Sequence, residues 1–249
     1  MRWGRRRSGR RTPALTAAQR ATAWQCASLL LDYPTSQQPL EAIGAAVGPL
    51  PELVGEPLRR FVDHRLTTDL VDLQADYVAT FDTRRRCNLY LTYFVHGDTR
   101  KRGMALLRFK QAYQAAGLEL TDAELPDHLC VVLEFAATVD GAVGQQLMTD
   151  HRAGLEMLRM ALRDADSPWA DVMEAVSATL PALRGEEVEA VQRLAAEGPP
   201  DEEVGLTPYG TPAFDALLSS ATREQPVDLP MPTVPPRAAP AAVPDTKGA

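Results

Sequence analysis

Residues 77–137 read YVATFDTRRRCNLYLTYFVHGDTRKRGMALLRFKQAYQAAGLELTDAELPDHLCVVLEFAA and hold most of the aromatic residues of the chain. An aromatic segment at 89–95 precedes apolar residues at helical spacing that end at Gly117, and ELPDHL at 124–129 opens a second apolar helix. Segment 89–95 is β-prone, but no other stretch offers it a partner strand, so we expect a helix or an irregular buried segment there. This stretch predicts an all-α fold.

Helical patterns also cover most of the chain on either side. Thr16 and Gln19 form a capping box that predicts a first helix at 16–33. We expect Asp98 to cap the helix that ends at Gly117, Ser167 to cap a helix at 168–180, and prolines to occupy several first turns. Further helices are predicted at residues 39–47, 57–66, 68–82, 125–136, 144–162 and 186–196. Joined by short connections, these patterns predict a single-domain bundle of more than four helices.

The two ends differ in composition from the middle. The first eleven residues hold six arginines and no acid, and residues 226–244 hold seven prolines, so neither end can bury a core. We expect a disordered Arg-rich tail at 1–14, an all-α domain at 15–218 and a disordered Pro- and Ala-rich tail at 219–249. Without the six arginines the net charge of −7 becomes −13. An acidic body argues against nucleic-acid binding.

The N-terminal arginines do not read as a secretory signal. A signal needs an apolar run of about 7–15 residues next, and Gln19, Arg20 and Gln25 interrupt the run that follows here. No stretch approaches the roughly 20 apolar residues of a membrane span. We therefore expect a cytoplasmic protein without stable membrane insertion. The three cysteines are far apart and form no C-x-x-C pair, which predicts reduced thiols rather than disulfides or a zinc site.

Asp127 and His128 suggest a metal or acid–base site, but the spacing does not support one. A metal-dependent hydrolase of the His-Asp kind needs the reverse order and further histidines, and His64, His96 and His151 have no second ligand at i+3 or i+4. The sequence also lacks G-x-S-x-G, a cysteine beside a base and a glycine-rich phosphate loop. We expect neither a catalytic nor a metal site.

A basic cluster lies within the opening stretch. Its members are Arg84, Arg85, Arg86, Arg100, Lys101, Arg102, Arg108 and Lys110, which with Asp82 and Asp98 give a local balance of +6. Such a cluster fits docking against an acidic partner surface, because complementary charge speeds encounter and fixes orientation. Pairing with the domain's own carboxylates explains it equally well.

Aromatic residues interleave with this cluster, and their crowding suggests a groove for an apolar peptide helix. They are Tyr77, Phe81, Tyr90, Tyr93, Phe94 and Tyr113. Glu124, Asp127 and Glu134 would be available for basic side chains of such a peptide. Core packing is the alternative for each aromatic taken singly.

Three runs within this region, YVATFD, NLYLTYFVHGDTRKRGMALLRFKQAYQAAGLEL and ELPDHLCVVLEFAA, together resemble one family. The family that they resemble comprises the nitrate reductase molybdenum cofactor assembly chaperones, that is, the NarJ family among the TorD-like redox enzyme maturation proteins. The resemblance covers about residues 24–165 and rests on the pair G-D-[ST]-R-x-R-G and E-L-P-D-H-L. These signatures fall on Gly97, Asp98, Arg100, Arg102, Gly103, Glu124, Pro126, Asp127 and His128. Cys130 stands where relatives often have a second proline, which should ease extension of the helix through this turn.

The resemblance implies an all-α chaperone of the TorD-like type without enzymatic turnover. It implies binding of the immature alpha (catalytic) subunit of a respiratory nitrate reductase, through its N-terminal leader peptide and as apo-enzyme, until molybdenum cofactor is inserted and the membrane complex assembles. No cofactor would bind stably to the chaperone, which would be a monomer or weak dimer. The expected client-binding residues are Glu124, Asp127, His128, Tyr77, Phe81, Tyr90, Tyr93, Arg100 and Arg102.

Two other readings of the sequence stay open. One is a sister chaperone for another molybdoenzyme, of the dimethyl sulfoxide or trimethylamine N-oxide reductase type. The other is a helical enzyme or a regulator that uses the arginine tail on nucleic acid.

Overall fold

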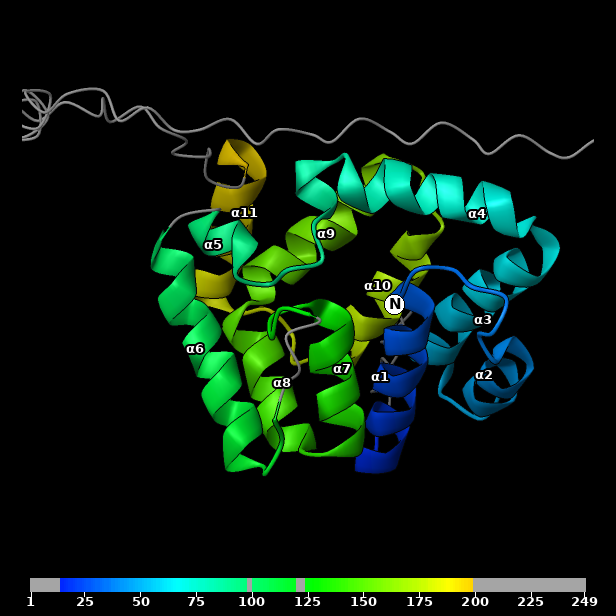
Figure 1. Ribbon diagram of the computed structural model, residues 1–249, viewed down its shortest axis with the longest axis horizontal. Coiled ribbons are helices and arrows are strands. Elements are labelled where there is room, and N and C mark those ends of the chain that lie inside the picture. Colours follow the sequence, from blue (N-terminus) through cyan, green and yellow to red (C-terminus); the bar gives the residue numbers. More distant parts are fainter. Residues whose placement is uncertain (1–13, 98–99, 120–123, 199–249) are drawn as a thin grey trace, which may run out of the picture. The chain divides into compact units, whose positions relative to one another are not determined.

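The computed structural model describes residues 14–97, 100–119 and 124–198, and the regular structure in these ranges is helical (Figure 1). The only β-type pairing within them is one isolated bridge between Tyr90 and His128. The predicted all-α class is confirmed. The predicted cap Asp98 and, apart from Ala14, both predicted tails lie outside the described residues.

The helices follow one another with short connections. The α-helices are α1 Ala17–Leu31, α2 Leu40–Val47, α3 Glu52–Thr67, α4 Leu70–Tyr77, α5 Tyr93–His96, α6 Arg100–Ala115, α7 Leu129–Thr138, α8 Gly141–Asp150, α9 Arg152–Asp164, α10 Trp169–Thr179 and α11 Gly185–Glu197. Between α4 and α5 lie a π-helical turn, η1 Val78–Asp82, and a 3-10 turn, η2 Arg85–Cys87.

Helix α1 lies at the centre and packs against both α7 and α10. Its predicted capping box is present, because the Gln19 N–H donates to Thr16 Oγ1 at 3.1 Å and the Thr16 N–H to Gln19 Oε1 at 2.9 Å. Polar contacts add to the apolar packing on both sides. Trp24 Nε1 donates to Thr179 Oγ1 on α10 at 2.8 Å, and Ser28 Oγ donates to the Cys130 carbonyl on α7 at 2.9 Å.

An aromatic cluster forms the second part of the core. The indole of Trp169 on α10 lies 5.4–5.6 Å, between ring centroids, from the rings of Phe61, Tyr77 and Phe81. The predicted helix at 68–82 positions the last two, with Asp69 as its N-cap and its final turn π-helical. The Tyr77 and Phe81 rings meet the indole edge to face, and such pairs stabilise a core beyond their buried area.

Two predictions about local structure are confirmed around the quoted stretch. Segment 89–95 is irregular and largely buried, and only its last residues enter the short helix α5. Gly117 ends α6 with a φ of +80°. The Leu118 N–H donates to the Tyr113 carbonyl at 3.0 Å and the Gly117 N–H to the Gln114 carbonyl at 2.9 Å, which is the Schellman pattern.

Two predicted helix starts are wrong. Pro57 does not open a helix, because α3 begins at Glu52 after Pro51 and carries Pro57 in its interior. Pro126 and Asp127 do not form the first turn of α7, which begins at Leu129 with His128 as its N-cap. The reason is long-range: the backbone before Leu129 pairs with segment 89–95 instead of continuing a helix.

Two further predictions in the C-terminal half are wrong. The pattern at 144–162 is two helices, α8 and α9, separated at His151, whose backbone leaves the helical region at φ −109° and ψ 23°. Ser167 does not cap α10: the N-cap is Pro168, and the buried Ser167 hydroxyl has no hydrogen-bond partner among the described residues.

Candidate functional site

The two signature stretches of the sequence meet in space. Backbone pairing first joins ELPDHL to the segment before GDTRKRG, since the Leu91 N–H donates to the Asp127 carbonyl at 3.1 Å and the Leu129 N–H to the Leu89 carbonyl at 2.9 Å. Arg102 then approaches from the first turn of α6, and its Nη2 lies 3.6 Å from Asp127 Oδ2. GDTRKRG and ELPDHL are therefore two parts of one junction.

The Asp127 carboxylate is the centre of this junction. It is fully buried, and its Oδ2 accepts hydrogen bonds from the Thr92 N–H at 3.1 Å and from the Thr92 hydroxyl at 2.6 Å. Arg102 Nε donates to the same Thr92 hydroxyl oxygen at 3.1 Å. A buried carboxylate needs such partners, because an unpaired charge in the interior is costly. Asp127 thus holds Thr92 and Arg102 in place.

Tyr90 and His128 close the junction on its outer side. Their rings pack edge to face at a centroid distance of 5.1 Å, and the Arg102 guanidinium lies over the Tyr90 ring at 5.2 Å, a cation–π arrangement. Burial lowers the pKa of His128, against an opposing effect of Glu124, and raises the pKa of Tyr90. Both rings are therefore neutral at pH 7. We call Tyr90, Thr92, Arg102, Asp127 and His128 the Asp127 junction.

A second contact fixes the other end of α6 to the same turn. The Tyr113 hydroxyl donates to the Pro126 carbonyl at 2.7 Å, and its ring packs on Phe135 of α7 at 4.7 Å. Burial raises the pKa of Tyr113, so the phenol keeps the proton that it donates. Arg102 and Tyr113 hold α6 at its two ends against the turn that precedes α7.

An open groove lies between the end of α6 and α7, beside Tyr113. Its volume is ≈ 270 Å³, its apolar lining includes Leu118, Val131, Phe135 and Val139, and Glu119 and Glu134 stand at its edge with exposed side chains. We call it the α6–α7 groove. An apolar floor with carboxylates at the edge suits a basic amphipathic peptide.

The predicted aromatic groove does not form as one site. Tyr77 and Phe81 lie in the core against Trp169, and Tyr93 is buried, with its hydroxyl accepting from Arg85 Nε at 3.0 Å. Tyr90 belongs to the Asp127 junction. The six aromatics are thus divided among separate contacts, and Tyr113 is the one that lines the α6–α7 groove.

The predicted charged residues also separate. Glu124 is exposed, His128 is partly buried and Asp127 has no exposed surface, so its carboxylate does not stand at the edge of a groove. Arg102 faces the junction with 13% of its side chain exposed. Arg100 lies in the first turn of α6, and its side chain is outside the described residues.

Sequence reasoning missed the residues that complete these arrangements. Thr92 bridges Asp127 and Arg102, yet a lone threonine between aromatic residues carries no signal of such a role. Leu118 and Glu119 line the groove because Gly117 reverses the chain at the end of α6. The predicted stop at Gly117 was a usable signal for them, since residues just after a helix end are commonly exposed.

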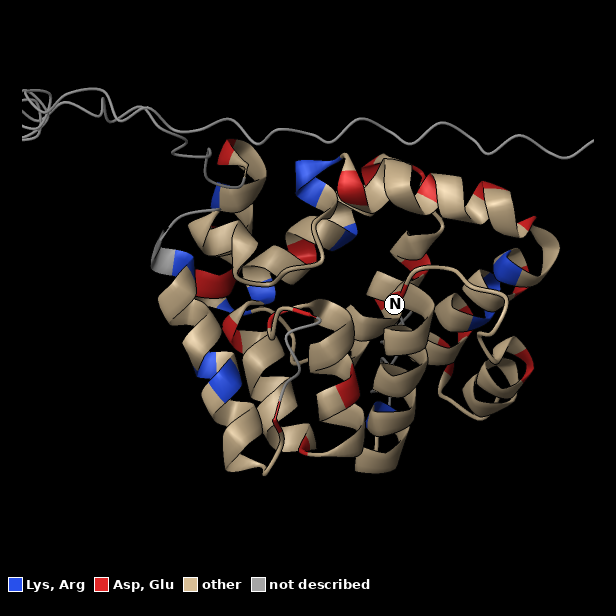
Figure 2. Ribbon diagram, in the orientation of Figure 1, with Lys and Arg blue, Asp and Glu red and all other residues tan. Residues whose placement is uncertain are grey.

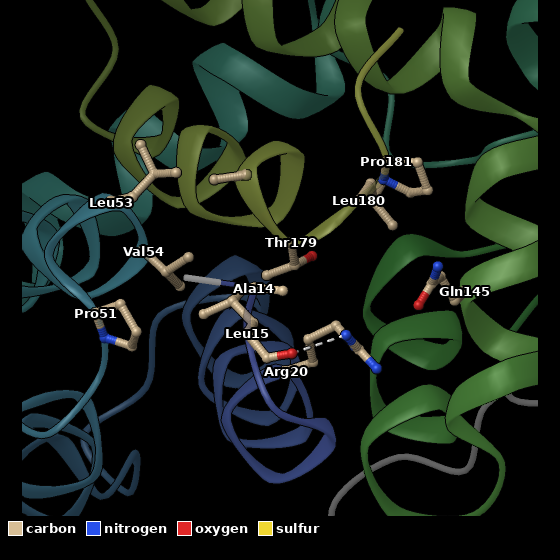
Figure 3. A pocket seen from close by; sticks show the side chains of 11 residues that line it. Ala14, Leu15, Arg20, Pro51, Leu53, Val54, Gln145, Thr179, Leu180 and Pro181 are labelled. Carbon is tan, nitrogen blue, oxygen red and sulfur yellow. Dashed lines mark hydrogen bonds between the residues drawn. The ribbon is translucent and has the colours of Figure 1, made fainter. Parts of the chain in front are cut away.

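Another cavity lies at the start of α1, with a volume of ≈ 330 Å³ (Figure 3). Leu15, Leu53 and Val54 give it an apolar lining, and Arg20 donates to the Leu15 carbonyl at 3.0 Å. None of its described lining residues is a carboxylate, and none belongs to the Asp127 junction. It does not offer the edge charges that a basic peptide needs.

The side chains and helices in the ranges 14–97, 100–119 and 124–198 offer neither a metal site nor a membrane span. No group of three or more His, Cys, Asp or Glu side chains there is placed to hold a metal ion. None of the helices in these ranges combines the length and apolar character needed to cross a membrane. Cys26, Cys87 and Cys130 are all free and buried.

The sequence profile of a family described as nitrate reductase delta subunit matches residues 48–175. The nitrate reductase-like protein NarX of Mycobacterium tuberculosis is 42% identical over 159 residues, which are 63% of this chain and 24% of that protein. This chain therefore spans about a quarter of the length of NarX.

Two further relatives are named as chaperones and not as enzymes. The "Probable nitrate reductase molybdenum cofactor assembly chaperone NarJ" of Bacillus subtilis is 29% identical over 171 residues, covering 67% of this chain and 92% of the relative. The nitrate reductase molybdenum cofactor assembly chaperone NarJ of Escherichia coli is 34% identical over 149 residues, covering 57% and 63%.

Proposed function

Because this chain belongs to the nitrate reductase delta subunit family, we propose that it is an assembly chaperone for a respiratory nitrate reductase. Its client is the immature catalytic subunit, recognised in the cytoplasm through the N-terminal leader peptide. The chaperone supports insertion of molybdenum cofactor into that subunit and delays membrane assembly until insertion is complete. The cofactor is cargo for the client.

The observation that carries the leader-binding part is the α6–α7 groove. A leader of twin-arginine ancestry is basic and amphipathic, so its receptor needs an apolar surface bordered by carboxylates. The apolar surface is formed by Leu118, Val139 and Phe135, and the bordering carboxylates are the exposed side chains of Glu119 and Glu134. The sequence also predicts that Glu134 is available for basic residues of a peptide.

The Asp127 junction has a supporting role in this proposal. Asp127 fixes Thr92 and Arg102 and so positions the first turn of α6, while Tyr113 links the Pro126 carbonyl to the groove. Asp127 is therefore a positioning residue for the groove. Among the other residues expected to contact the client, Glu124 has an exposed side chain from which to reach a peptide. No contact of Tyr77 or Phe81 places them in this groove.

Isothermal titration calorimetry with a synthetic leader peptide of the client tests the proposal. The double variant Glu119→Gln, Glu134→Gln should bind about 2- to 30-fold more weakly, since each exposed ion pair contributes about 0.2–1 kcal/mol. Val139→Asp should weaken binding about tenfold or more, because it puts a charge on the apolar floor. Both changes are at partly or fully exposed positions, so the fold should tolerate them.

Glu41→Gln is the matched control, because Glu41 is an exposed carboxylate that does not line the groove and lies on α2, on the opposite side of the view from α6 (Figure 1). It should bind the leader like the wild type. Unchanged affinity in both groove variants would exclude this groove as the leader site.

A further inference from the structure

A third cavity lies between η2 and α9, with a volume of ≈ 610 Å³. Its edge carries three consecutive arginines, Arg84, Arg85 and Arg86, and its floor is formed by one face of α9. Different elements build it from those of the α6–α7 groove. We call it the arginine-edged cavity.

Positive charge predominates among the described residues at this edge. The side chains of Arg84 and Arg86 are exposed and make neither a hydrogen bond nor an ion pair with any part of the chain that the structure describes. Arg85 is tied to the Tyr93 hydroxyl, and Asp164 is the one carboxylate among the described lining residues. Figure 2 shows the basic segment beyond the acidic helix α4, which the turn η1 separates from it. This positive edge belongs to a chain with a net charge of −7.

The floor of the cavity is apolar and follows helical spacing. Met157, Met160 and Ala161 stand at i, i+3 and i+4 on α9, and the C-cap residue Ala165 and Ala195 of α11 border them. Met160, Ala161 and Ala165 are only partly buried, so this face of α9 keeps accessible apolar surface. Methionine side chains adapt to irregular partners, and small alanines allow close approach.

We propose that the arginine-edged cavity docks an acidic amphipathic segment of the client, a site separate from the leader groove. Carboxylates on such a segment pair with the guanidinium groups, while its apolar residues cover the α9 face. A small anion would use the arginines and leave the apolar floor exposed, whereas an acidic peptide uses both. The inference rests on the proposed function, because it takes the same client, and it gives the chaperone a second contact of opposite charge.

Photo-crosslinking in the chaperone–client complex tests this proposal. A benzophenone amino acid replaces Met160 in the full chain, the complex with the apo catalytic subunit is irradiated, and crosslinked peptides are identified by mass spectrometry. The expected product joins position 160 to a client segment with net negative charge. Crosslinks to the leader, to this chain itself, to a second copy, or to nothing overturn the proposal.

Charge variants provide an independent measurement. The double variant Arg84→Gln, Arg86→Gln should bind the apo subunit about tenfold more weakly at low ionic strength, with a smaller salt dependence. Its affinity for the isolated leader peptide should not change. Arg108→Gln, an exposed arginine of α6 that does not line the cavity, is the matched control and should bind like the wild type. Unchanged affinity and salt dependence in the double variant overturn the proposal.

The two proposals fail in different ways. If the wild type binds neither leader nor apo subunit, the proposed function fails and this inference fails with it. If the wild type binds the leader but the position 160 crosslink and the charge variants give the negative results above, only the second docking site is refuted.

Discussion

Replacing Asp127 with alanine should lower the free energy of unfolding by about 3–5 kcal/mol, the range observed when one partner of a buried ion pair is removed. The structural reason is specific. The substitution removes the acceptor of the Thr92 N–H and of the Thr92 hydroxyl, and it removes the carboxylate that lies 3.6 Å from the mostly buried Arg102 guanidinium. Asp127 has no exposed surface, so water cannot replace the lost partner without a rearrangement.

A double-mutant cycle separates the ion pair from the rest of the effect. Arg102→Leu alone should destabilise the fold, and the same change in the Asp127→Ala background should cost less, with a coupling energy of about 0.5–3 kcal/mol. The coupling includes the path through Thr92, because Arg102 Nε donates to the hydroxyl that itself donates to Asp127.

Urea unfolding followed by far-ultraviolet circular dichroism measures these values, provided that the m-values stay equal. Asp63→Ala is the control, since Asp63 is an exposed carboxylate of α3, and it should stay within about 0.5 kcal/mol of the wild type. A cost below about 1 kcal/mol for Asp127→Ala, or strict additivity with Arg102→Leu, would show that the buried junction does not stabilise the fold.

Three further outcomes follow from packing and protonation. Gly144→Ala should lower the free energy of unfolding in urea by about 1–3 kcal/mol, because the added Cβ would lie 2.3 Å from the Ala136 Cβ. A Cβ added at Gly103 meets no atom within 4 Å, so Gly103→Ala should be neutral or slightly stabilising. Burial lowers the pKa of His151 from 6.5, so the unfolded state binds more protons than the folded state as the pH falls through this range. The free energy of unfolding should therefore fall as the pH drops from about 7.5 to 5.5. It should fall less steeply in the variant His151→Gln than in the wild type. Burial raises the pKa of Cys26 to about 11, and all three buried thiols should react with a thiol reagent only after unfolding; fast reaction of the native protein would contradict their burial.

Local signals in the sequence predicted local structure well. The Thr16–Gln19 capping box and the stop at Gly117 depend only on residues within one turn, and both are present. The same reasoning misplaced the helix starts at Pro57 and Pro126, because proline is compatible both with a first turn and with other positions. Pairing between segments 89–91 and 127–129 decided the second case, and no local pattern reports a contact across that separation.

The same difference explains the outcome for the candidate site. The sequence singled out Asp127 and Arg102 as members of two signatures, but charge and spacing could not tell an exposed carboxylate from a buried one. The burial of Asp127 depends on Thr92, 35 residues earlier. The Thr92 hydroxyl accepts a hydrogen bond from Arg102 Nε and donates one to the Asp127 carboxylate. The groove itself depends on where α6 ends relative to α7, and this placement is a property of the tertiary structure that local sequence patterns do not report.

The signature residues Asp127 and Arg102 lie in a buried polar junction and not in the open apolar groove. Their role in leader binding is therefore to position α6, not to contact the peptide. Among the described side chains of α6 only Phe109 and Tyr113 are buried, so this helix depends on the contacts at its two ends for its position against α7. Loss of Asp127 should therefore lower fold stability and leader affinity together, because both require α6 in place. Loss of Glu134 should lower affinity alone. A variant of Asp127 that kept full stability and still lost the leader would instead assign this carboxylate a direct contact.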